Sequence, residues 1–133
     1  MSIVVGFIPT PEGEAALVRG AIEARQRQTS LIVVSSKDPA REPDPSAVAR
    51  FEAELDAVKG RLAEEGLEYD VRRIDTGRMA SEDLLDVAEE VEADMIVIGL
   101  RRRSPIGKLI LGSQAQQILL GAECPVLAVK VPR

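Results

Sequence analysis

Several residue types that build common active sites are missing from this chain or nearly so. Its 133 residues include no histidine and one cysteine, Cys124. Without histidine, the usual zinc sites lack their nitrogen ligands, and the most frequent acid–base catalyst is absent. A single cysteine cannot form a disulfide within the chain, a pattern typical of proteins in the reducing cytoplasm. We interpret Cys124, which precedes Pro125, as a small buried core residue.

Long apolar runs and an excess of basic charge are absent too. No segment approaches the roughly 20 apolar residues that a membrane-spanning helix needs, and no basic lead opens the chain. We therefore expect no signal peptide and no membrane association. The net charge of −5 argues against a general nucleic-acid binder. The local cluster of Arg101, Arg102, Arg103 and Lys108 stands out against this acidic background.

Strand-like and helix-like segments alternate along the chain, which predicts a single α/β domain over residues 1–133. Apolar runs indicate the strands, and apolar residues spaced three and four apart indicate the helices. Thr10-Pro11 and Asp44-Pro45 each supply an N-cap and a proline for the first helical position. The expected strands are 3–8, 31–34, 67–74, 95–98 and 126–131, and the expected helices are 11–28, 45–65, one capped by Ser81 and one after Gly112-Ser113.

The connections between these segments predict the sheet and the place of a ligand. Segment 67–74 alternates apolar and polar residues, as an edge strand with one solvated face does. Right-handed crossovers then give a doubly wound, five-stranded parallel sheet of order 3-2-1-4-5 with helices on both faces. Ligands of such sheets bind where the strand order reverses, here between the first and fourth strands. The loops at that point are 7–11 and 99–112.

Segment 95–113 combines the features of an anion site. A buried strand stops at Gly99, a cationic loop follows, and Gly112-Ser113 precedes the next helical pattern. Ser113 and Gln116 have the spacing of a capping box, so we expect that helix to start with Ser113 as its cap. Backbone N–H groups and the positive end of a helix dipole suit a phosphate.

Other chemistries are disfavoured by particular residues. A P-loop would need glycine where Arg102 stands and serine or threonine where Leu109 stands. A phospho-acceptor receiver domain needs acids at the end of the first strand, where Ile8, Pro9 and Thr10 stand. The helix acids fall on polar faces, and no nucleophile stands beside a base. We therefore predict no catalytic residue and no metal site.

The order of these pieces resembles the universal stress protein family. The likeness covers the whole chain: an I-V-V opening strand, then A-D-M-I-V-I-G, the long loop, G-S, and a closing C-P-V-L-A-V-K strand. Nucleotide-binding members of that family carry G-2x-G-9x-G-[S/T], whose glycines and hydroxyl wrap the phosphates and ribose of ATP. Here Gly99 and Gly112-Ser113 match this motif, while Arg102 replaces the middle glycine and Ile8 stands where those members usually have aspartate.

The resemblance implies a cytoplasmic stress-response protein that binds an adenine nucleotide (ATP, ADP or AMP, with or without Mg²⁺) or a similar phosphorylated anion. At most, slow ATP hydrolysis is expected. The phosphate side would consist of Gly99, Arg101, Arg102, Gly112, Ser113 and Gln114. The adenosine side would consist of Phe7, Ile8, Pro9, Thr10, Ser36 and Ile98.

Alternatives remain open at several of these positions. The arginine at 102 loses the backbone freedom of glycine but brings a planar cation that pairs bidentately with phosphate. Arg102 would therefore either bind the phosphate of the ligand or block its approach to the loop. Thr10 is first of all an N-cap, and Ser36 can simply end a strand. The alternative function is that of a nucleotide-free, dimeric interaction or scaffold protein of the same family. Since family members commonly dimerise through the last strand, we expect a homodimer that pairs through 126–131.

Overall fold

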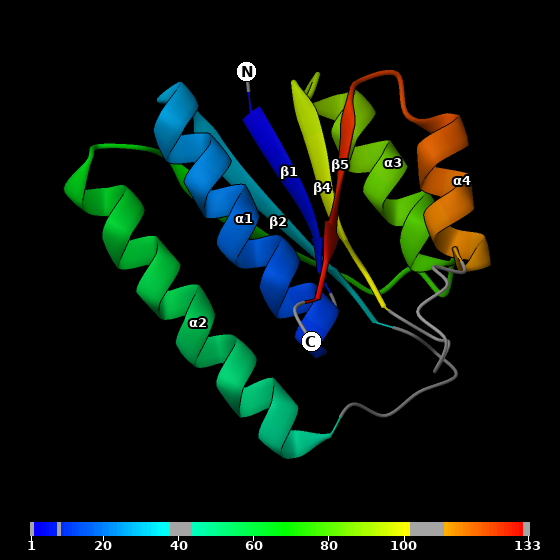
Figure 1. The fold of residues 1–133 in the computed structure, drawn as a ribbon, viewed down its shortest axis with the longest axis horizontal. Coiled ribbons are helices and arrows are strands. Elements are labelled where there is room, and N and C mark those ends of the chain that lie inside the picture. Colours follow the sequence, from blue (N-terminus) through cyan, green and yellow to red (C-terminus); the bar gives the residue numbers. More distant parts are fainter. Residues whose placement is uncertain (1, 8, 38–43, 102–110, 132–133) are drawn as a thin grey trace.

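The computed structural model describes residues 2–7, 9–37, 44–101 and 111–131, which form a five-stranded parallel sheet covered by helices (Figure 1). The strand order is β3-β2-β1-β4-β5, so the predicted fold class is confirmed. The strands are β1 Ser2–Phe7, β2 Ser30–Ser36, β3 Tyr69–Ile74, β4 Met95–Leu100 and β5 Val126–Lys130. The helices are α1 Pro11–Arg27, α2 Pro45–Glu64, α3 Ala80–Glu90 and α4 Ser113–Gly121.

Two apolar cores lie on opposite faces of the sheet. Ile3 and Val5 of β1 pack against α1 and α2, whereas Val4 between them packs against α3 and α4. All three side chains are fully buried. A central parallel strand covered on both faces has no solvated side, which explains the continuous apolar runs in the sequence. Within the described residues, no helix combines the length and the apolar character needed to cross a membrane.

The first two helices begin at the predicted residues and end one residue before the predicted ends. The Thr10 hydroxyl oxygen accepts a hydrogen bond from the Gly13 N–H at 3.1 Å, and Asp44 caps α2 through the Ser46 N–H at 3.0 Å. After α2, Gly66 has φ +70°, a left-handed conformation that glycine adopts without steric cost. Local caps alone therefore set these boundaries.

The predicted caps of the other two helices are wrong. Met79 is the N-cap of α3, so Ser81 lies inside the helix, where its side chain is buried. Gly112 is the N-cap of α4, and Ser113 is the first helical residue. Neither N-cap residue makes a side-chain hydrogen bond to its own helix. These polar groups bond elsewhere: the Ser81 hydroxyl makes a tertiary contact with α4, and Gln116 Nε2 donates locally to the Leu111 carbonyl at 3.1 Å.

All five strands differ by one to two residues from their predicted bounds, and the differences in β4 and β3 have identifiable physical causes. β4 continues past Gly99 to Leu100, and Gly99 pairs with Val129 of β5. β3 begins at Tyr69, because the Leu67 N–H donates to the Leu62 carbonyl at 2.9 Å and so belongs to the exit from α2. Gly99 is therefore part of the sheet.

Candidate functional site

The carboxyl ends of β1 and β4 lie side by side where the strand order reverses. These two strands pair in parallel, with Val5 opposite Val97. The chain after β1 enters α1 on one face of the sheet, and the chain after β4 leads to α4 on the other face (Figure 1). In this class of fold, ligands usually bind beside the strand ends at such a point of divergence.

Gly99 brings the first turn of α1 against the end of β4. A Cβ added to Gly99 would lie 1.9 Å from the carbonyl oxygen of Glu12, far inside van der Waals contact. Any side chain at this position would push α1 away from the sheet. Gly99 therefore has a packing role that does not depend on a ligand.

The N-terminus of α4 presents a positive dipole end without a local counter-charge. Its first turn contains no acidic residue, and Ser113 and Gln114 are exposed there. By contrast, α1 and α3 carry acids in their first turns, among them Glu12 and Glu82. Acids at that position interact favourably with the helix dipole, so their absence leaves the start of α4 better suited to an external anion.

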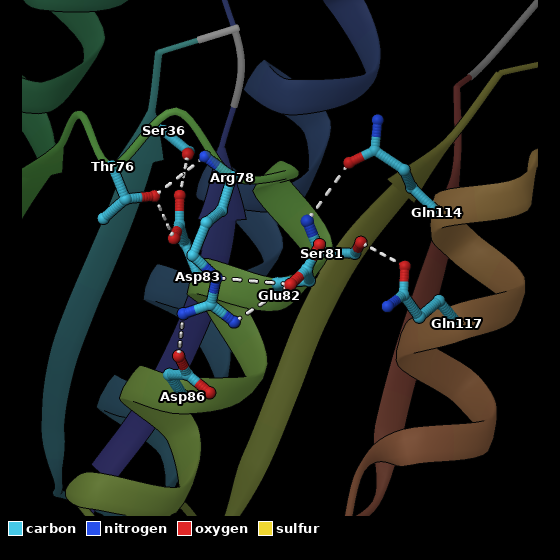
Figure 2. Close-up of polar contacts among 9 residues, drawn as sticks. All are labelled: Ser36, Thr76, Arg78, Ser81, Glu82, Asp83, Asp86, Gln114 and Gln117. Atoms are coloured by element: carbon cyan, nitrogen blue, oxygen red, sulfur yellow. Dashed lines mark hydrogen bonds and ion pairs between the residues drawn. The ribbon is translucent and has the colours of Figure 1, made fainter.

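Gln114 and Gln117 attach the start of α4 to α3 through Ser81. Gln114 Oε1 accepts the Ser81 backbone N–H at 3.1 Å, and the Ser81 hydroxyl donates to Gln117 Oε1 at 2.6 Å (Figure 2). The first bond satisfies one of the N–H groups that the beginning of α3 cannot pair within the helix. The Gln114 carboxamide is thus oriented with its oxygen on α3 and its NH₂ group pointing away from Ser81.

A buried carboxylate organises the ends of β2 and β3. Asp83 of α3 is only 3% exposed; the Ser36 hydroxyl donates to its Oδ2, and the Thr76 hydroxyl donates to its Oδ1 at 2.8 Å. The Arg78 N–H in turn donates to Thr76 Oγ1 at 3.1 Å (Figure 2). We did not predict this carboxylate from the sequence. Its signal was the i, i+4 spacing to the buried Val87, which places Asp83 on the apolar face of α3.

The other residues proposed for the adenosine side lie at or near the strand ends. Pro9 and Thr10 are half-buried between β1 and α1, and Phe7 ends β1, with its backbone paired to Ser35. Ile98 is buried in the core that faces α3 and α4. Ile8 lies outside the described residues.

The predicted cationic residues are described only in part. Arg101 is exposed and directly follows β4, whereas Arg102 lies outside the described residues. Among the residues that the structure does describe, no group of three or more histidine, cysteine or acidic side chains could hold a metal ion. Cys124 is half-buried against the α3–α4 core, and this burial raises the pKa of its thiol, so less of the reactive thiolate forms at neutral pH.

Comparisons with known proteins agree with this architecture. The Universal stress protein family matches residues 1–130. A universal stress protein of Mycolicibacterium smegmatis is 41% identical over 130 residues, which cover 96% of each chain. The structure of a universal stress protein from Archaeoglobus fulgidus is similar with a TM-score of 0.71 and 32% identity, over 97% of each chain. A second structure, that of the universal stress protein from Archaeoglobus fulgidus in complex with dAMP, is also similar. Its TM-score is 0.64 and its identity is 28%, over 97% of this chain and 96% of that one. The chain belongs to the universal stress protein family.

Proposed function

We propose that this protein binds an adenine nucleotide across the carboxyl ends of β4, β1 and β2. The observation that carries the proposal is the start of α4, which lies at the same end of the molecule as the carboxyl ends of the strands (Figure 1) and has an exposed Ser113 and no acid in its first turn. A helix N-terminus of this kind attracts phosphate through its N–H groups and its dipole. The similar protein solved with dAMP supports an adenine nucleotide as the ligand.

The phosphate side of this site combines helix and loop residues. Gly112 and Ser113 supply backbone N–H groups and a hydroxyl, and Gln114 can offer the NH₂ group that points away from α3. Gly99, Arg101 and Arg102 complete this side by their positions in the family motif. In this proposal the Arg102 guanidinium clamps a phosphate, in place of the close backbone approach that a glycine would permit. Any Mg²⁺ would be held chiefly by the phosphates it accompanies.

The adenosine side lies over β1 and β2. Pro9 and Thr10 line the start of α1, and Ser36 ends β2. Phe7 ends β1 in the same region, and Ile98 belongs to the adjacent strand β4. Ile8 is assigned to this side by its place after Phe7 in the sequence. Since no base stands beside a nucleophile in the sequence, the protein acts in this proposal as a nucleotide-responsive stress protein of the cytoplasm, with slow ATP hydrolysis at most.

Titration calorimetry with ATP, ADP and AMP tests this function. We expect binding that weakens between low and physiological salt, because charges contribute to it. Arg102→Gly should weaken binding if the guanidinium clamps the phosphate, whereas stronger binding would identify Arg102 as an obstruction. A folded protein that binds none of the three nucleotides at millimolar concentration would overturn the proposal.

The second candidate is a nucleotide-free dimeric scaffold, and the exposed edge of β5 favours it. The four residues Val126 to Val129 are uncharged and half-buried, and the first charge in the strand is Lys130. An apolar strand with an unpaired backbone edge can pair with a second copy of itself about a two-fold axis. A homodimer through this edge is compatible with either function, so nucleotide binding decides between them.

A further inference from the structure

We propose that Ser36 selects the base of the nucleotide, because the buried Asp83 takes the hydrogen of its hydroxyl group. Ser36 would then face the ligand only as a hydrogen-bond acceptor and would favour a purine with a 6-amino group over one with a 6-oxo group. This inference rests on the nucleotide binding proposed above and adds a determinant of specificity to it.

The position of Ser36 follows from the strand order. Ser36 is the last residue of β2, and β1 separates β2 from β4. Neighbouring strands are about 4.8 Å apart, so the end of β2 lies roughly 10 Å across the sheet from the end of β4. A nucleotide whose phosphate meets α4 can reach across β1 to this point with its base. On the other side of β4 the sheet contains only the edge strand β5.

The hydrogen bonds of Asp83 decide how the Ser36 hydroxyl points. A carboxylate can only accept, and a serine hydroxyl has a single hydrogen to donate. That hydrogen goes to Asp83 Oδ2, while Thr76 donates to Oδ1 (Figure 2). Asp83 would have to give up both bonds in order to rotate. The groups left on Ser36 for a ligand are therefore the lone pairs of its oxygen.

These lone pairs distinguish two otherwise similar nucleotides. The 6-amino group of AMP can donate to Ser36, whereas the 6-oxo group of IMP would place a second acceptor against it. A site that leaves a polar group unpaired loses binding, and the loss is larger where water is excluded. We expect wild-type protein to bind AMP about 10-fold more tightly than IMP, which corresponds to one good hydrogen bond.

Asp83→Asn should weaken or reverse this preference. Thr76 Oγ1 already accepts the Arg78 N–H, so its own hydrogen can continue to bond to the Asn oxygen at position 83. The Asn NH₂ group then faces Ser36, which must accept from it and thereby frees its own hydrogen for the ligand. The variant should therefore shift the ratio of AMP to IMP affinity toward IMP.

The experiment measures AMP and IMP affinities by calorimetry for the full chain and three variants. Ser36→Ala should reduce the preference to about 2-fold or less, Asp83→Asn should shift it toward IMP, and the control Thr76→Val, which leaves the Ser36–Asp83 bond in place, should retain it. Wild-type preference for IMP, or an unchanged ratio in Ser36→Ala, would overturn the inference while nucleotide binding stands. If wild-type protein binds neither nucleotide, the proposed function fails and this inference fails with it. If Asp83→Asn does not fold, Ser36→Ala and Thr76→Val still decide.

Discussion

The β2–β3 half and the β4–β5 half of the sheet differ in the hydrogen bonds and ion pairs of their polar groups and in the charge of their edge strands. On the β2–β3 side, side chains of the protein pair with one another: Asp83 bonds to Ser36 and Thr76, and Arg72 of the edge strand forms an ion pair with Glu90 at 2.9 Å. On the β4–β5 side, the start of α4 has no acid in its first turn and the edge strand has no charge before its last residue. In the first half, polar and charged side chains of the protein bond to one another. In the second half, the start of α4 and the backbone edge of β5 before Lys130 have no charged side chain beside them in the helix or strand itself.

This difference concerns association more than stability. Exposed ion pairs such as Arg72–Glu90 contribute little to the free energy of unfolding. Charged side chains on an edge strand do, however, discourage pairing with another chain. The β3 edge is thus protected from pairing with another chain, whereas the β4–β5 half carries the proposed phosphate site and the apolar edge at which a second copy would bind.

Gly99→Ala should have the largest effect, because it disturbs the contact between α1 and the β4–β5 half. The new methyl group would collide with the Glu12 carbonyl, and we expect a loss of about 3 kcal/mol in the free energy of unfolding. Urea denaturation measures this loss. The control Gly60→Ala lies in α2 with open space around it and should stabilise the protein by roughly 1 kcal/mol. A Gly99→Ala variant as stable as wild type would contradict the close approach of α1.

Ser113→Asp would make the start of α4 resemble the acidic starts of α1 and α3. The added carboxylate should stabilise the helix by about 0.3–1 kcal/mol through the dipole. It should also reduce nucleotide affinity by at least about 10-fold, because it repels the phosphate at short range. Calorimetry with ATP measures the second effect, and the neutral variant Ser113→Asn serves as the control. Unchanged affinity in Ser113→Asp would place the phosphate elsewhere.

Ala128→Pro should separate the proposed dimer without breaking the sheet. The Ile96 N–H bonds to the Pro125 carbonyl at 3.0 Å, so the parallel register directs the N–H of Val129 toward β4 and that of Ala128 outward. Proline at 128 removes only an outward donor, which an edge strand tolerates. Light scattering should report a dimer for wild type and for Ala128→Val, and a shift toward monomer for Ala128→Pro. A monomeric wild type at high micromolar concentration would contradict the prediction.

We expect the smallest effect, a change of stability with pH, from the ionisation of Tyr69 on the edge strand β3. Burial, with a contribution from the nearby Asp56 carboxylate, raises the pKa of Tyr69 from 10.0 to about 12. A pKa that is higher in the folded state means that the stabilising contribution is complete below pH 10.0 and is lost as the pH rises toward about 12. Because Tyr69 is the single tyrosine and tryptophan is absent, near-ultraviolet absorbance can follow its ionisation directly. A native midpoint near the ordinary value would contradict the burial of this ring.

Much of the fold could be predicted because its signals are local. The caps at Thr10 and Asp44 lie within a few residues of the helices they start, and the apolar runs of β1 and β4 follow from burial on both faces. The alternation of strands and helices, with the known handedness of crossovers, then left few topologies open. The candidate phosphate site could be proposed for the same reason, since its motif is contiguous in sequence, and it stays a prediction.

The remaining features depend on partners distant in sequence. Serine is a common N-cap residue, yet the Ser81 hydroxyl is buried and donates to Gln117, which lies 36 residues away in the sequence. Asp83 looks like one more surface acid of a helix until Ser36, 47 residues earlier, is brought beside it. Local propensity cannot indicate such bonds, because the choice between water, a cap and a tertiary partner depends on which helices are neighbours.

The sequence by itself determined the alternation of elements, the order of the strands and the family, and it indicated where a phosphate is proposed to bind. Only the tertiary structure decided that Gly99 is a packing residue against Glu12, that Gln114 holds α3, and that Asp83 directs the Ser36 hydroxyl. The physical reason is that periodicity and capping act over a few residues. Close approach of backbones and the direction of a buried hydrogen bond arise only when separate elements pack together.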